Sequence, residues 1–102
     1  MFWKGNRLTS AAFKDKRGLS VDRTGDRDII TSVDFMKTRL EGYIFSLSII
    51  DCYHVHADPK YLPTSNLYHC EIHGSPHIIE LDDDQALYFA ENAICEYSPY
   101  EL

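Results

Sequence analysis

Hydrophobic and polar residues alternate over the middle of the chain, and this period-two pattern is typical of β-strands. It predicts a long strand over 43–56. Because that length exceeds a typical strand, we expect a bulge or bend near Asp51. A second strand is predicted over 67–73, and the prolines between the two strands predict a loop over 57–66.

Shorter apolar runs bounded by turn residues predict two further strands, over 19–21 and 77–81. Before the first of them, Thr9 and Ser10 can cap a single helical turn over 11–13. The chain therefore offers strand-forming segments on both sides of its centre.

Two segments show the helical spacing of apolar residues, three and four positions apart. The first runs over about 30–40, where Thr31 and Asp34 form a capping-box-like pair. The second follows Asp82, which is predicted as the N-cap, with Gln85 at the third helical position and further acids in the first turn. Both predicted helices therefore have a start signal and an apolar stripe.

The connections between the predicted strands are too short for parallel crossovers, so the strands are expected to pair antiparallel. The order of elements predicts a small α+β fold, in which two main helices pack on one face of an antiparallel sheet of about 3–4 strands. At 102 residues the chain has the length of a single domain, 1–102. A loose C-terminal tail is expected from about 96, where Pro99 interrupts regular structure.

Charge divides the chain into two unequal parts. Residues 1–28 carry seven Lys and Arg against four acids, whereas residues 29–102 carry three against twelve, and the whole chain has a net charge of −6. This balance disfavours direct binding of duplex nucleic acid and suits a protein partner that is basic or is itself a nucleic-acid-binding enzyme. We find no apolar run of membrane-spanning length and no signal-peptide pattern, so a cytoplasmic protein is expected.

The three cysteines, Cys52, Cys70 and Cys95, lie in unlike contexts and form no C-x-x-C pair. This sparse, odd number fits a reducing cytoplasm, where cysteines act as small buried hydrophobic residues. A bridge between Cys52 and Cys70 across neighbouring strands is the alternative.

The N-terminal part of the chain contains cationic and hydroxyl side chains that could converge on a phosphate or carboxylate. The predicted ligand-binding residues are Arg7, Ser10, Lys14, Ser20 and Arg23. With His69 as a general base and Arg7 stabilising the developing charge, they would form a metal-independent phosphodiester cleavage site. The simpler interpretation is a set of surface salt bridges with neighbouring acids.

All five histidines lie between positions 54 and 77. His54 and His56 share one face of the predicted long strand and are the candidate metal ligands, because imidazole nitrogen binds zinc. Their spacing matches no recognised metal-binding loop, and the polar faces of the two predicted strands point to opposite sides beyond the bend. We therefore expect no bound metal and no cofactor.

Familiar catalytic signatures are missing from the sequence, which has no Walker loop, no G-x-G-x-x-G, no G-x-S-x-G and no H-E-x-x-H motif. The missing signatures, the small size and the acidity favour a binding or accessory protein that acts through a protein partner and has no catalysis of its own. The alternative is a nucleotide- or RNA-directed ligand binder, or the phosphodiesterase described above.

Three short motifs are spread over most of the chain: R-L-T-S-A-A-F-K at 7–14, G-L-S-V-D-R at 18–23 and Y-H-C-E-I at 68–72. In these motifs the chain resembles a set of small bacterial proteins of uncharacterised activity with the layout R-x-[ST]-x-x-x-F-K, G-[LI]-S-V and H-x-x-I. The resemblance implies a prokaryotic cytoplasmic protein encoded in a mobile-element or defence locus. It carries over no catalytic residue and directs attention to Arg7, Ser10, Lys14, Ser20 and His69.

Overall fold

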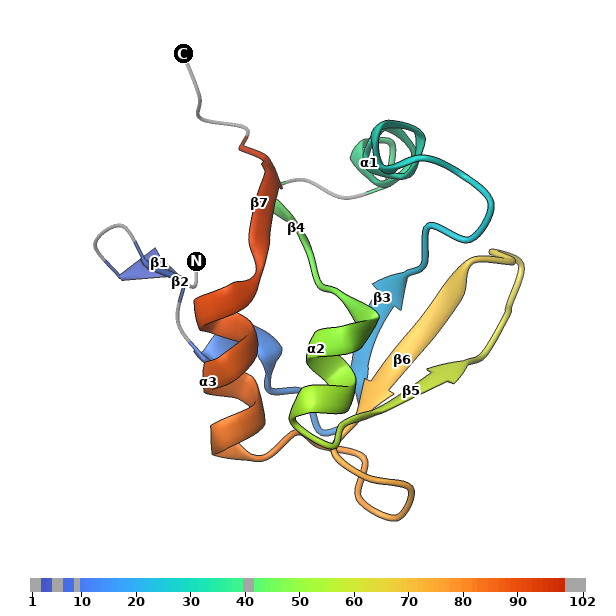
Figure 1. The fold of residues 1–102 in the computed structure, drawn as a ribbon. Coiled ribbons are helices and arrows are strands. Elements are labelled where there is room, and N and C mark those ends of the chain that lie inside the picture. The colour runs from blue at the N-terminus through green and yellow to red at the C-terminus, as the bar shows by residue number, and fades with distance from the viewer. Residues whose placement is uncertain (1–2, 5–6, 9, 40–41, 99–102) are drawn as a thin grey trace.

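The computed structural model describes residues 3–4, 7–8, 10–39 and 42–98 of the chain (Figure 1). Its elements follow one another as β1 (Trp3–Lys4), β2 (Arg7–Leu8), the 3-10 turn η1 (Ser10–Phe13), β3 (Leu19–Asp22), α1 (Ile29–Lys37), β4 (Ile44–Ser46), α2 (Ile49–His54), β5 (Asp58–Tyr61), β6 (His69–His73), α3 (Asp83–Asn92) and β7 (Ile94–Tyr97). The predicted small α+β class is confirmed.

The described strands pair antiparallel throughout, and they divide among separate small sheets. The largest sheet has the order β3-β6-β5, while β4 pairs with β7 and β1 with β2. In the three-stranded sheet, Glu71 of the central strand lies between Ser20 of β3 and Lys60 of β5. The strands predicted at 19–21 and 67–73 are therefore confirmed as β3 and β6, and the first gains a pairing partner distant in sequence.

The hydrophobic core lies where α3, α2 and η1 meet the three-stranded sheet (Figure 1). Phe89 of α3 is fully buried, and its ring centre lies 6.0 Å from that of Phe13 in η1. Cys52 of α2 and Ile72 of β6 complete the contact between helices and sheet. The core thus joins segments from both ends of the chain.

The two main predicted helices are confirmed as α1 and α3. At the start of α3, Asp82 and Gln85 form the predicted capping box, in which each side chain accepts a hydrogen bond from the main-chain N–H of the other. The predicted pairing of Thr31 with Asp34 at the start of α1 is wrong. Asp28 is the N-cap, and the hydrogen bond that its carboxylate accepts from the Thr31 N–H lowers the pKa of Asp28.

The predicted long strand over 43–56 is wrong beyond its first residues. β4 ends at Ser46, and the segment expected to bend at Asp51 is the helix α2. Ser48 begins this helix, since its hydroxyl accepts a hydrogen bond from the Ile50 N–H. Cys52 and Val55, three positions apart, then face the core. The residues of this segment alternate between apolar and polar, but the Ser48 cap and the helical spacing of its core contacts favour a helix.

The structure also differs from the predictions made for the segments over 57–66, over 77–81 and from about 96. The predicted loop over 57–66 contains β5, which tolerates Pro59 because it is an edge strand and loses no ladder hydrogen bond there. No strand forms over 77–81, where the described chain instead makes turns. Residues 96 and 97, at the expected start of a loose tail, belong to β7, and 99–102 lie outside the described residues.

Candidate functional site

The structure places the predicted ligand-binding residues on different elements. Ser10 begins η1, and Lys14 follows that turn. Lys14 Nζ lies 2.9 Å from Asp83 Oδ1 in the first turn of α3, and this hydrogen bond raises the pKa of Lys14. For Arg7 the structure describes the main chain in β2 and not the side chain. Lys14 is therefore engaged in an exposed ion pair with the first turn of α3.

Arg23 lies just beyond the end of β3, where it packs on aromatic rings rather than beside Lys14. Its guanidinium carbon lies 4.4 Å from the centre of the Tyr61 ring and 5.6 Å from that of Tyr68. Ser20 lies between the two cations in sequence, on an exposed position of β3. Among the described side chains, the predicted cluster does not form one site.

His69 belongs to a polar row on β6, which faces away from the core. The carboxylate of Glu71 lies 3.6 Å from His69 Nε2 and 2.8 Å from His73 Nε2. The hydrogen bond with His73 lowers the pKa of Glu71. The proximity of His69 to Arg7, which the alternative activity requires, falls outside the described residues because the Arg7 side chain is not described.

The two candidate metal ligands, His54 and His56, do not share a strand face. His54 ends α2 and stacks on Tyr88, with 4.9 Å between the ring centres. His56 follows in the left-handed region, with a φ of 59°. No group of three or more His, Cys, Asp or Glu side chains in the described residues could hold a metal ion.

The cysteines are free thiols, including Cys52 and Cys70, which we considered as an alternative disulfide pair. Burial raises the pKa of Cys52 to about 11 and also raises that of Cys70. A thiol with a raised pKa supplies little thiolate near neutral pH, so these two cysteines act as hydrophobic residues rather than nucleophiles.

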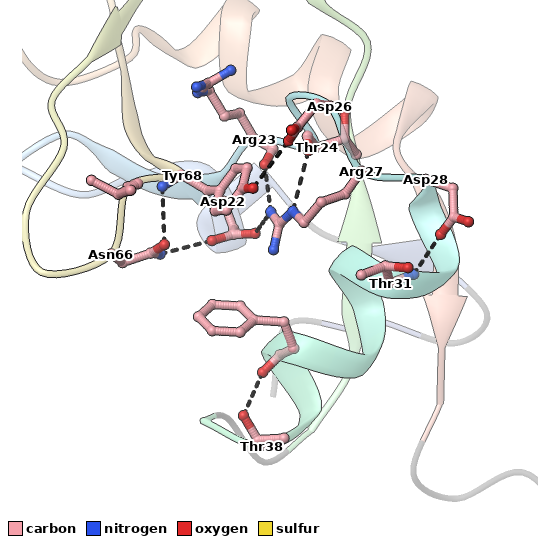
Figure 2. A network of polar contacts seen from close by, with 12 residues as sticks. Asp22, Arg23, Thr24, Asp26, Arg27, Asp28, Thr31, Thr38, Asn66 and Tyr68 are labelled. Carbon is pink, nitrogen blue, oxygen red and sulfur yellow. Dashed lines mark hydrogen bonds and ion pairs between the residues drawn. The ribbon is translucent and has the colours of Figure 1, made fainter.

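A buried ion pair between Asp22 and Arg27 joins the end of β3 to the turn that leads into α1 (Figure 2). The Asp22 side chain is 6% exposed and that of Arg27 is 12% exposed. Asp22 also accepts a hydrogen bond of 2.8 Å from the Asn66 side-chain amide, and the Arg27 guanidinium lies 3.5 Å from the centre of the Tyr68 ring. This network fixes the turn after β3 against the loop before β6.

The described residues enclose a cavity of about 630 Å³. It lies between β3, α1, β4 and α2, and its floor includes core residues of η1 and β6. The lining side chains are mainly apolar, among them Val21, Val33, Met36 and Phe45. Its size falls in the usual range for sites that take up ligands, about 300–1,000 Å³.

Ser32 places a hydroxyl group in the wall of this cavity. The residue is only 3% exposed, and its Oγ has no hydrogen-bond partner in the described part of the chain. A buried hydroxyl without a partner costs about 1–3 kcal/mol. The Ser32 hydroxyl therefore lowers the stability of the free protein. It offers a hydrogen-bond donor and acceptor to a ligand in the cavity.

Replacing Ser32 by Ala is expected to raise the free energy of unfolding of the free protein by about 1 kcal/mol, because it removes the unpartnered hydroxyl and improves helix propensity. Urea unfolding measures the change. Asp34→Ala, on the exposed side of the same helix, controls for helix propensity. A Ser32→Ala gain no larger than that of Asp34→Ala would show that the hydroxyl has a partner.

Two of the predicted ligand-binding residues, Ser20 and Arg23, line this cavity, but sequence analysis missed Ser32 and the ion pair beside the cavity. Ser32 was not noticed because it is polar, yet it follows Ile29 by three positions and precedes Met36 by four, which places it on the apolar side of the helix. Asp22 and Arg27 are opposite charges on either side of a polar turn. That spacing signals a local pair but does not show that the pair is buried.

No helix in the described part of the chain is long and apolar enough to cross a membrane. A comparison with models of protein families finds no match, so the resemblance stated from the short motifs stays a prediction. Comparisons with curated proteins and with solved structures find no match either. The geometry of the cavity is therefore the basis for a functional proposal.

Proposed function

We propose that this protein is a cytoplasmic, non-catalytic binding protein that holds apolar side chains of a protein partner in the cavity between β3, α1, β4 and α2. The cavity itself carries the proposal, because its volume of about 630 Å³ and its mainly apolar lining are those of a binding site. Filling it with apolar groups would remove that surface from water, which favours binding.

Two exposed isoleucines line this space. They are Ile29 of α1, 40% exposed, and Ile49 of α2, 51% exposed. Single exposed apolar residues are normal on a protein surface, whereas a group of them at an apolar cavity is typical of an interaction site.

The charge of the chain favours a basic partner. The net charge is −6, and twelve acids lie beyond residue 28. At the cavity, Glu96 of β7 accepts a hydrogen bond of 2.9 Å from the Ser46 hydroxyl, and no described cation forms an ion pair with it. A Lys or Arg of the partner would form an ion pair with Glu96. The free thiols agree with a cytoplasmic location.

The nucleotide- or RNA-directed alternative has less support. Lys14 is bound to Asp83, and Arg23 packs on Tyr61, so neither cation is placed for a shared phosphate. The cavity wall is mainly apolar, and an apolar wall does not favour a polyanion.

The proposal predicts that peptides selected by this protein combine apolar and basic residues and depend on the cavity. The probe is a displayed library of random peptides, selected on the immobilised full chain. Ile49→Gln should weaken binding of the selected peptides about tenfold, since an apolar contact at the cavity is lost. Ile50→Gln is the matched control, because Ile50 is the next residue and does not line the cavity.

Titration calorimetry measures the affinities, and circular dichroism checks that both variants are folded. Loss of affinity in Ile49→Gln alone supports the proposal. Failure to select any peptide above background, or equal affinity of both variants, overturns it.

A further inference from the structure

The cavity covers one face of the three-stranded sheet, at Leu19, Ile72 and Pro59, and continues past the edge of β3 to β4. Its lining includes every residue over 19–24 and every residue over 43–49. Successive side chains of a strand point to opposite faces, so a run of neighbouring residues can line one space only where that space passes the strand edge. The outer edge of β3 therefore borders the cavity, which β4 also lines.

The outer edge of β3 has no partner strand among the described residues. β3 is the outer strand of the order β3-β6-β5, and β4 pairs with β7. In Figure 1, β4 is drawn next to β3, yet no ladder joins them among the described strands. An unpaired edge is a template for another strand.

The hydrogen-bonding direction of β3 shows which main-chain groups face the cavity side. The Arg23 N–H donates to the Tyr68 carbonyl, so Tyr68 bonds toward β3, whereas the Leu62 N–H donates to the carbonyl of the next residue, His69, which bonds toward β5. Hydrogen-bonded pairs alternate along an antiparallel ladder, so positions 19 and 21 of β3 also bond to β6. The N–H and C=O groups of Ser20 and Asp22 therefore point outward from the free edge of β3.

We infer that the partner segment enters the cavity as an extended strand, which forms main-chain hydrogen bonds with the edge of β3 and lies between β3 and β4. The inference rests on the proposed function and deepens it by naming the form of the bound segment. Strand addition of this kind takes its affinity from the main chain and its specificity from alternate side chains.

The walls of the cavity define the sequence of such a segment. One face of the added strand would meet the apolar side chains of α1 and the core, including Val33 and Met36. Glu96, which lines the same cavity without a cation partner in the described chain, would meet a basic residue. The expected partner is thus a protein segment in which Val, Ile or Leu alternates with Lys or Arg.

The test replaces Ser20 by Pro and, as a matched control, by Ala. Proline removes the outward N–H and puts ring carbons in its place, but leaves the β6 ladder intact because the Ser20 N–H does not take part in it. For the tightest peptide of the library selection, we expect Ser20→Pro to weaken binding about tenfold or more, and Ser20→Ala to change it less than about twofold.

A second measurement does not depend on the folding of a variant. The same peptide, synthesised with one N-methyl group at each position in turn, is titrated into the unaltered protein. N-methylation at central positions should reduce affinity about tenfold, since each removes a main-chain donor from the ladder.

The outcomes separate this inference from the proposed function. If peptides still require Ile49 but bind Ser20→Pro and the N-methylated series normally, the bound segment is not a strand and the inference is overturned. If Ile49 has no effect, the proposed function itself fails. The free chain could also form a dimer that Ser20→Pro abolishes, with no peptide selected. That result would show that a second copy of the chain pairs with the β3 edge, and it would overturn the inference of a partner strand.

Discussion

Replacing Arg27 by Ala is expected to lower the free energy of unfolding by about 3–5 kcal/mol. The substitution leaves the buried Asp22 carboxylate, 6% exposed, without its cation, and only the Asn66 amide remains as a partner among the described side chains. It also removes the hydrogen bond of 2.6 Å from the guanidinium to the Arg23 carbonyl and the stacking on Tyr68. A small domain has about 5–15 kcal/mol of stability in total, so the loss is a large fraction of it.

Urea unfolding followed by tryptophan fluorescence and circular dichroism measures this loss. Arg17→Ala is the control, because the ion pair of Arg17 with Asp15 is exposed at the surface and such pairs contribute about 0–1 kcal/mol. Equal effects of the two substitutions would show that Arg27 and Asp22 are solvated, contrary to the structure.

Replacing Gln85 by Glu is expected to lower the free energy of unfolding by about 2–4 kcal/mol. Gln85 is 5% exposed, and its side-chain amide donates to the carbonyls of Val55, at 3.0 Å, and Gly74, at 2.8 Å. Glutamate has the same length and can still accept from the Asp82 N–H, but when ionised it leaves both carbonyls without a donor. The change therefore separates the capping role of the side chain from its tie to two other segments.

The loss of stability in Gln85→Glu should depend on pH, and burial of the new carboxyl determines whether it grows or shrinks as the pH falls. A buried carboxyl facing carbonyl oxygens has a folded-state pKa above its ordinary value of about 4.3, because the neutral form can still donate one hydrogen bond. The folded state then binds the proton more tightly, so the deficit should shrink as the pH falls through the raised folded-state pKa toward about 4.3. Asp84→Asn, exposed in the same turn, is the control, and an equal small effect of both variants would contradict this role of Gln85.

Local signals were enough for the elements whose ends are marked by side-chain to main-chain hydrogen bonds. Asp82 and Gln85 predicted the start of α3, because a capping box is made within four residues of the chain. Alternation predicted β6 and β3, whose apolar residues reach the core. The same alternation misled over 49–54, where the Ser48 cap and the contact of Cys52 with the core favour a helix. Short apolar segments satisfy both periods, and packing decides between them.

The order of residues was sufficient to predict a small α+β chain with excess acid, two main helices and the capping box of α3. The folded structure was needed to show that Lys14 and Arg23 contact different elements, that Asp22 and Arg27 form a buried pair, and that β3 and β4 line one cavity. The difference follows from how far apart in the sequence the interacting residues lie. Caps and periodicity depend on neighbours within a few residues, whereas a cavity and a free strand edge are defined by which distant segments pair and which do not.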